Sequence, residues 1–216
     1  MSTAPLGLFG GTFDPVHFGH LRAAEESRER LGLERLVLLP AGDPPHRERT
    51  FAPAPERLEM LRCAVREHPE FEVDDREVRR GGASYMADTL ADLREAHPDA
   101  PLLLIIGQDS ANGLHRWHRW QALFELAHLV VMTRPGARHD YERELARELG
   151  ARTVDDRAPL LSEPAGRVLY LAITQLAISS TGIREMIAAG RSPRFLLPDP
   201  VLTYIEDRGL YRASRD

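Results

Sequence analysis

The chain has 216 residues, 43% of them hydrophobic and 28% charged, a balance typical of a globular protein with one or two domains. Its formal net charge of −5 argues against nucleic acid as a partner, and its single cysteine, Cys63, excludes an internal disulfide framework and favours a reducing compartment. Since no signal peptide or membrane-spanning stretch can be recognised, we expect a cytoplasmic protein without a membrane partner.

Short apolar stretches alternate along the chain with stretches that favour helices. The predicted strands, of which the third runs into a loop, are 5–11, 35–40, 71–82, 102–107, 128–136 and 167–172. The predicted helices are 20–32, 56–68, 84–98, 120–127, 140–150, 180–190 and 199–211. Because the strands are apolar throughout, this alternation predicts one α/β domain over residues 1–216, built on a parallel sheet with helices on both faces. We expect the helices from about residue 180 onward to form a small C-terminal subdomain.

The first predicted strand ends at two glycines, Gly10 and Gly11, and a helix begins near Phe18. Glycine permits a tight turn and the close approach of a ligand. The N–H groups and the positive dipole end of the helix favour an anion at the same place. His17 and His20 lie on one side of the first helical turn, where their imidazoles can donate hydrogen bonds to phosphate oxygens.

Other interpretations of this stretch remain open at this point. The two histidines could bind a metal, or could simply lie on a solvent-exposed helix start that follows an Asp-Pro turn. The glycine spacing does not match a dinucleotide-binding turn. A Walker loop is excluded because the chain contains no lysine.

A second polar stretch, "ISSTGIR", covers residues 178–184. Its hydroxyl groups can cap a helix start, and Arg184 follows one turn later. This pattern predicts either a second phosphate site facing the first or an ordinary helix cap with a surface arginine.

Together, "GGTFDPVHFGH" and "ISSTGIR" resemble the two signature motifs of the nucleotidylyltransferase superfamily. The further stretches "PPHR", "SYMADTL", "IIGQDS" with "WHRW", "RPG" and "LLPDPVLTYIEDRGLY" occur in the order typical of bacterial nicotinate mononucleotide adenylyltransferases. This resemblance covers nearly the whole chain. It implies a Rossmann-like domain that joins ATP and nicotinate mononucleotide to give nicotinate adenine dinucleotide and pyrophosphate. The alternative substrates are nicotinamide mononucleotide or another phosphorylated compound.

The resemblance also implies that Mg²⁺ is bound mainly through the ATP phosphates, with no protein ligands assigned to it, and it leaves homo-oligomer formation open. It implies catalytic roles for His17, His20 and Arg184. Asp109 would accept a hydrogen bond from a ribose hydroxyl, and Ile178 would border the adenine. The implied ATP-binding residues are Gly10, Gly11, Thr12, Phe13, His17, His20, Gly107, Asp109, Ile178, Ser180, Thr181 and Arg184.

For nicotinate mononucleotide, the resemblance implies that Trp117 stacks on the pyridine ring. The polar neighbours of Trp117 favour this role over a position in the core, which we expect for Trp120. Met86 stands where the family usually has a threonine that helps to hold the nicotinate carboxylate. The implied residues for this substrate are Asp14, His46, Arg47, Tyr85, Met86, Trp117 and Arg134.

Overall fold

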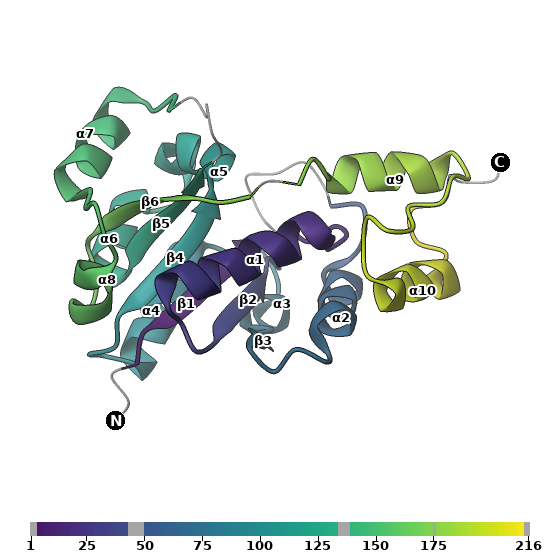
Figure 1. The fold of residues 1–216 in the computed structure, drawn as a ribbon, viewed down its shortest axis with the longest axis horizontal. Coiled ribbons are helices and arrows are strands. Elements are labelled where there is room, and N and C mark those ends of the chain that lie inside the picture. Colours follow the sequence, from purple (N-terminus) through teal and green to yellow (C-terminus); the bar gives the residue numbers. More distant parts are fainter. Residues whose placement is uncertain (1–3, 43–49, 134–138, 175, 214–216) are drawn as a thin grey trace.

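The computed structural model describes residues 4–42, 50–133, 139–174 and 176–213. Its centre is a six-stranded parallel sheet in the order β3-β2-β1-β4-β5-β6 (Figure 1), which is the Rossmann strand order. The strands are β1 (Leu6–Gly11), β2 (Leu36–Pro40), β3 (Phe71–Val73), β4 (Leu102–Gly107), β5 (His128–Thr133) and β6 (Val168–Ala172). The fold therefore confirms the predicted parallel α/β architecture.

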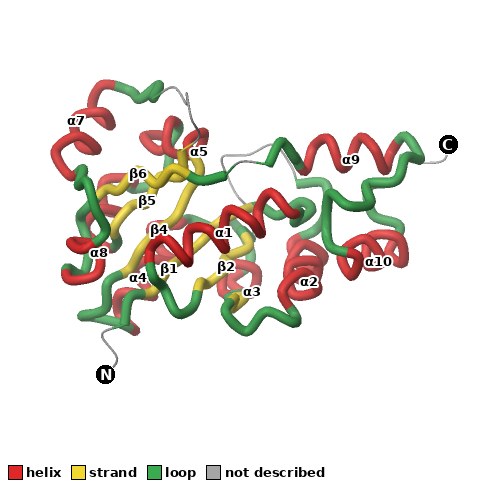
Figure 2. The backbone as a smooth tube through the Cα atoms, in the orientation of Figure 1, coloured by secondary structure: helices red, strands yellow, loops and turns green. Residues whose placement is uncertain are grey.

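Helices cover both faces of this sheet (Figure 2). The α-helices are α1 (Phe18–Leu31), α2 (Ala54–Val65), α3 (Arg76–Arg80), α4 (Met86–Ala96), α5 (Gln108–Asn112), α6 (Leu123–Leu126), α7 (Arg143–Arg152), α8 (Ala158–Ser162), α9 (Ser180–Ala188) and α10 (Asp199–Arg208). Two short 3₁₀ helices, Leu114–Arg116 and Trp120–Ala122, follow α5. Among the helices of the described residues, none has both the length and the apolar character needed to cross a membrane.

The strands supply both hydrophobic cores by alternating their side chains between the two faces of the sheet. In β4, Leu103 and Ile105 pack in one core with residues of α1, α2, α9 and α10. Leu104 and Ile106 of the same strand pack in the other core with α4, α6 and α7. Trp120 is buried in this second core, as expected from the sequence. Burial on both faces explains why the strands read as continuous apolar runs.

The last two helices lie at one end of the molecule, beyond the β3 side of the sheet (Figure 1). α10 packs against α2, and the Tyr204 hydroxyl donates to Glu56 Oε2 at 2.7 Å. The N–H of Phe18, at the start of α1, donates to the carbonyl of Leu196 at 3.0 Å. The C-terminal helices are thus bonded to the elements that follow β1 and β2.

Residues 71–82 were predicted as a strand that leads into a loop; the strand is present at Phe71–Val73, but the loop was wrong at Arg76–Arg80, where the chain forms the short helix α3. Asp74 redirects the backbone, because its carboxylate accepts the backbone N–H of Arg76 at 2.9 Å and also pairs with the Arg76 guanidinium. The short helices α5 and α8 were not predicted either. Each has only five residues, too few to show a helical hydrophobic period.

Candidate functional site

Two pockets meet at the carboxyl ends of β1 and β4, the two central strands. The chain runs to opposite sides of the sheet from these neighbouring strands, and such a switch point is where open α/β sheets bind ligands. Both pockets are lined by Gly10, Gly11, Thr12 and Ser110. The glycine turn is therefore a shared wall, so ligands in the two pockets would touch the same stretch of backbone.

Side chains larger than that of glycine are sterically excluded from two positions near this turn. A Cβ on Gly11 would lie 2.8 Å from the ring of Phe13, which is buried and has a φ of 50°. At Gly19, in the first turn of α1, a Cβ would lie 2.9 Å from the imidazole of His17. Glycine at these two positions leaves room for the rings of Phe13 and His17 to pack against the backbone.

The larger pocket brings together the two polar motifs found in the sequence. His20 lines it from α1, and Ser180, Thr181 and Arg184 line it from α9. The Ser180 hydroxyl donates to the carbonyl of Pro15 at 2.9 Å, so the two motifs are bonded directly. Gly107 at the end of β4 and Asp109 in the first turn of α5 line the same pocket. The structure thus places most of the residues expected at ATP around one cavity.

Arg184 is oriented by three contacts. One terminal nitrogen donates to the carbonyl of Asp14 at 2.7 Å, and the other donates to Thr181 Oγ1 at 3.1 Å. Its guanidinium lies 4.1 Å from the ring centroid of Phe51. An arginine held in this way presents fixed charge to the pocket, which suits an anionic ligand.

His17 and His20 take up different environments. Their rings stack with centroids 3.8 Å apart, but His17 is buried and only His20 lines the larger pocket. Burial lowers the pKa of His17 from 6.5 to about 4, so this imidazole is neutral at neutral pH. Its Nδ1 is buried without a hydrogen-bond partner among the described residues. His20 is therefore better placed than His17 to meet a ligand in the pocket.

Asp14, which we expected to touch the nicotinate mononucleotide, is buried at the larger pocket. Its Oδ2 accepts the N–H of Phe51 at 2.8 Å, and its Oδ1 accepts the N–H of Ala52 at 3.1 Å and the Tyr211 hydroxyl at 2.7 Å. Burial, followed by the bond to Asp14, raises the pKa of Tyr211, so its hydroxyl remains a donor. The carboxylate thus joins three separate segments beside the site.

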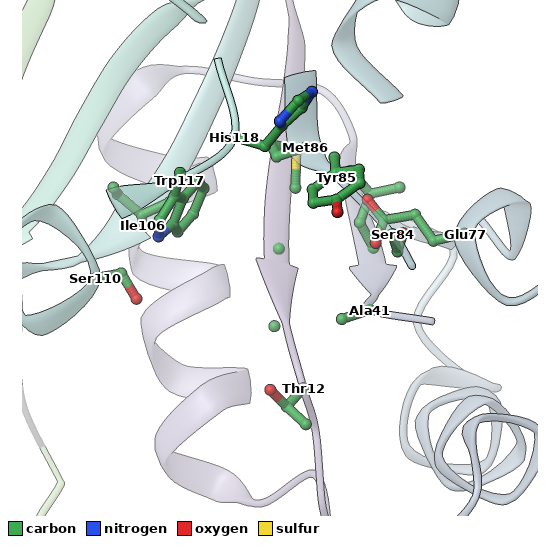
Figure 3. Close-up of a pocket in the computed structure, with 13 residues that line it drawn as sticks. Thr12, Ala41, Glu77, Ser84, Tyr85, Met86, Ile106, Ser110, Trp117 and His118 are labelled. Atoms are coloured by element: carbon green, nitrogen blue, oxygen red, sulfur yellow. The ribbon is translucent and has the colours of Figure 1, made fainter. Parts of the chain in front are cut away.

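The smaller pocket is lined largely by aromatic and apolar groups (Figure 3). Trp117 and Tyr85 stand on opposite sides of the space above β1, with Met86 between them. Trp117 is half-buried against the second core, so the structure gives it both a packing role and a face on the pocket. His118 packs on the Tyr85 ring at a centroid distance of 4.4 Å and also lines the pocket. This geometry suits a flat ring placed between aromatic walls.

The start of α4 forms one side of this pocket. In the described part of the chain, no side chain caps this helix, and the N–H of Asp88 donates to the carbonyl of Tyr85 at 3.1 Å, so the N–H groups of Met86 and Ala87 remain for a ligand or water. Met86, the first residue of α4, reaches the glycine turn, because a Cβ on Gly10 would lie 3.2 Å from its Cε. The positive end of the helix dipole favours a negatively charged ligand at this side.

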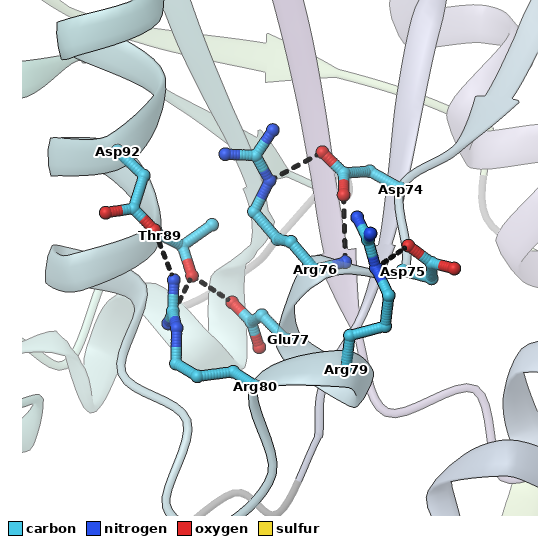
Figure 4. Close-up of polar contacts among 8 residues, drawn as sticks. All are labelled: Asp74, Asp75, Arg76, Glu77, Arg79, Arg80, Thr89 and Asp92. Atoms are coloured by element: carbon cyan, nitrogen blue, oxygen red, sulfur yellow. Dashed lines mark hydrogen bonds and ion pairs between the residues drawn. The ribbon is translucent and has the colours of Figure 1, made fainter.

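Glu77 of α3 is almost fully buried and lines the pocket beside Ser84 and Tyr85, on the same side as the start of α4 (Figure 3). Figure 4 shows its polar contacts. Its carboxylate accepts the Thr89 hydroxyl at 2.8 Å, and Arg80 donates to the same hydroxyl at 3.3 Å while pairing with Asp92. These contacts join α3 to α4, so Glu77 and the start of α4 are fixed relative to one another.

Several pocket residues had no counterpart in the sequence analysis. His118 and Ser110 each lie within two residues of a predicted site residue, Trp117 and Asp109, and this proximity was the only available signal. No signal pointed to Glu77, because α3, which carries it, was predicted as strand and loop. The lining residues that were not predicted are Phe9, Leu39, Ala41, Thr50, Phe51, Glu77, Ser84, Ile106, Gln108, Ser110, His118 and Met132.

Five predicted residues are not placed at the pockets, and one of them is the buried His17. His46, Arg47 and Arg134 lie outside the described residues. Ile178 is half-buried against the core beneath α1 and is not among the residues that line either pocket. Its expected contact with adenine stays a prediction.

The likeness to known proteins agrees with this geometry. A family model described as cytidylyltransferase-like matches residues 8–186. A relative from Aeromonas salmonicida is 46% identical over 99% of this chain and 100% of its own length, and one from Marinobacter nauticus is 49% identical over 95% and 96%. Both are named "Probable nicotinate-nucleotide adenylyltransferase".

The chain belongs to the cytidylyltransferase-like family, among its nicotinate-nucleotide adenylyltransferases. The fold of this family member also matches a solved Plasmodium falciparum nicotinic acid mononucleotide adenylyltransferase complexed with NaAD. The TM-score is 0.73 over 96% of this chain and 97% of the other, at 14% sequence identity. At that identity, the structural likeness supports the shared fold, whereas the family assignment rests on the sequence relatives.

The buried His17 predicts how the stability of this adenylyltransferase depends on pH. Below pH 6.5, His17 binds a proton in the unfolded chain but not in the folded chain, until the pH reaches about 4. The free energy of unfolding should therefore fall as the pH is lowered through this window, by about 2–3 kcal/mol at pH 4.5 from this residue alone. We expect His17→Gln to lose less stability than wild type between pH 7 and 4.5 in urea unfolding.

His128 is also buried with a lowered pKa, and it acts in the same direction. Because both proteins retain His128, the difference between their slopes isolates His17. Identical slopes would contradict a neutral buried imidazole at position 17.

Proposed function

We propose that this chain joins ATP and nicotinate mononucleotide, releasing pyrophosphate and forming nicotinate adenine dinucleotide. The observation that carries the proposal is the pair of pockets that share the glycine turn. One pocket is lined by His20 and Arg184, and the other by Trp117 and Tyr85. A triphosphate suits the first and a pyridine ring suits the second, with the reacting phosphates meeting over the turn.

In this proposal the larger pocket takes ATP. His20 and Arg184 donate hydrogen bonds to phosphate oxygens, and the Thr181 hydroxyl at the start of α9 adds a neutral donor. Asp109, in the first turn of α5, accepts a hydrogen bond from a ribose hydroxyl. The stacked and neutral His17 supports the ring of His20 from the protein side.

The smaller pocket takes the nicotinate ring between Trp117 and Tyr85. The ring carboxylate then points to the start of α4, where backbone N–H groups and the helix dipole stabilise a negative charge.

The proposed reaction needs no protein nucleophile. A phosphate oxygen of the mononucleotide attacks the α-phosphorus of ATP, a new P–O bond forms, and the bond to pyrophosphate breaks with its electrons leaving on that group. Because the attacking phosphate is already anionic, catalysis consists of aligning the two substrates and stabilising the charge on the leaving pyrophosphate. His20 and Arg184 are the groups suited to the second task.

We further propose that Mg²⁺ accompanies ATP and neutralises part of the phosphate charge. Within the described ranges, no three His, Cys, Asp or Glu side chains gather as a metal site. Asp109 offers one exposed carboxylate at the larger pocket. This donor set fits a cation that takes most of its ligands from phosphate oxygens and water.

We also propose that residues 1–216 work as one nucleotidylyltransferase domain in the cytoplasm, with α9 and α10 as a C-terminal subdomain. The support is that α9 supplies Arg184 to the site and that α10 packs against α2.

A pyrophosphate-release assay tests the proposed function directly. The protein should release pyrophosphate from ATP only when nicotinate mononucleotide is added. His20→Ala should lower kcat by about 10²–10³, the usual cost of one donor to developing charge, while the Kd of ATP changes much less. No release by the wild type would overturn the function, and an unchanged kcat would remove His20 from the mechanism.

Trp117→Ala tests the assignment of the pockets. Loss of ring stacking should weaken the pyridine nucleotide by about 1–3 kcal/mol, by analogy with base–aromatic stacking. The Kd of ATP, measured by calorimetry on the same variant, should stay close to that of the wild type. Equal weakening of both ligands would mean that Trp117 supports the fold rather than the ring.

Met86→Thr tests where the carboxylate lies. The wild type should have a higher kcat/KM for nicotinate mononucleotide than for nicotinamide mononucleotide, because charge-assisted hydrogen bonds exceed neutral ones. An added hydroxyl at position 86 should widen this preference by about 1 kcal/mol. A wild type that prefers the amide would favour the alternative substrate. An unchanged ratio in the variant would place the carboxylate away from residue 86.

A further inference from the structure

Arg57 is a fully buried arginine on α2, beneath the wall that the two pockets share. Its guanidinium donates to three backbone carbonyls, one in the turn after β1 and two near the opposite ends of the connection between β2 and α2. Nη1 donates to Thr12 at 2.7 Å, Nη2 to Gly42 at 2.6 Å and Nε to Ala52 at 3.2 Å. Nothing in the sequence set this residue apart from the other polar positions of its helix.

Each of the three carbonyls belongs to a segment that borders the site. Thr12 lines both pockets, Ala41 next to Gly42 lines the smaller one, and Phe51 next to Ala52 lines the larger one. Because a peptide unit is planar, fixing the Thr12 carbonyl also fixes the direction of the following N–H, in the turn between the two ligands. A planar guanidinium with its donors in a rigid fork can set all three segments at once.

The backbone of Ala52 is held at both its N–H and its carbonyl. Its carbonyl accepts from Arg57, while its N–H donates to the carboxylate of Asp14 at 3.1 Å. A buried guanidinium carries a desolvation cost that an apolar side chain would avoid, so its contribution here is to geometry more than to stability.

We propose that Arg57 is a positioning residue that sets the glycine turn shared by the two substrates and thereby their alignment. Arg57 touches neither pocket in the structure, so its effect passes through the Thr12 peptide. This inference rests on the proposed adenylyl transfer, in which two anions must meet in line over that turn.

The test compares Arg57→Met with Arg94→Met. Arg94 is a matched control because it also donates to several backbone carbonyls, including those of Leu126, Ala100 and Pro164, but at the amino ends of the strands. Both variants are assayed below the onset of their thermal unfolding. Arg57→Met should lower kcat about 10–100-fold, as expected for a small misalignment, with each KM changed less than about threefold. Arg94→Met should lower the Tm but keep kcat within about twofold.

Arg57→Lys provides the conservative comparison. Its ammonium keeps the charge and can reach some of the three carbonyls, so kcat should lie between those of the wild type and Arg57→Met. If Arg57→Met does not fold, a kcat of Arg57→Lys equal to that of the wild type overturns the proposal. A kcat per folded molecule that is unchanged in Arg57→Met, or lowered equally in Arg94→Met, also overturns it.

Hydrogen–deuterium exchange separates this inference from the proposed function. Peptides covering residues 11–14 should exchange faster in Arg57→Met than in the wild type, and at the wild-type rate in Arg94→Met. This readout needs no turnover, so it tests the positioning role even if the wild type proves inactive with the two nucleotides. Unchanged exchange at residues 11–14 would show that Arg57 does not set the turn.

Discussion

The buried carboxylate of Asp14 is the contact on which the geometry of the site depends. It accepts hydrogen bonds from the backbone at Phe51 and Ala52 and from the hydroxyl of Tyr211, while the carbonyl of the same residue accepts from Arg184. The turn after β1, the segment before α2, the start of α9 and the C-terminal stretch therefore converge on one residue. A carboxyl group removed from water needs hydrogen-bond partners, and here the partners come from the segments that surround the larger pocket.

The two histidines show how burial divides similar residues into different roles. Because His17 is neutral at neutral pH, its stacking on His20 does not place two positive charges face to face. The outer ring can then donate a hydrogen bond to an anionic ligand while the ring behind it carries no charge. Gly19 makes the pairing possible, since any side chain there would collide with the inner imidazole.

Features encoded over a short stretch could be predicted from the sequence. The glycine turn, the helix behind it and the capped start of α9 each follow from neighbouring residues, and Ser179 caps that helix as its type suggests. Features that depend on contacts between distant segments could not be predicted. The hydrogen bonds of Asp14, the burial of Arg57 and the different environments of the stacked His17 and His20 rings arise from tertiary packing. The short helices α3, α5 and α8 escaped prediction because they depend on tertiary contacts and local turns rather than on a hydrophobic period.

The bond between Tyr211 and Asp14 joins residues 197 positions apart in the chain. During synthesis at about 5–20 residues per second, roughly 10–40 seconds separate the appearance of these two side chains. Throughout that interval a nascent chain already carries the glycine turn and both histidines, but it lacks the hydroxyl that completes the environment of the carboxylate. The site is therefore assembled late in translation, and a prematurely terminated chain would lack a finished nucleotide site.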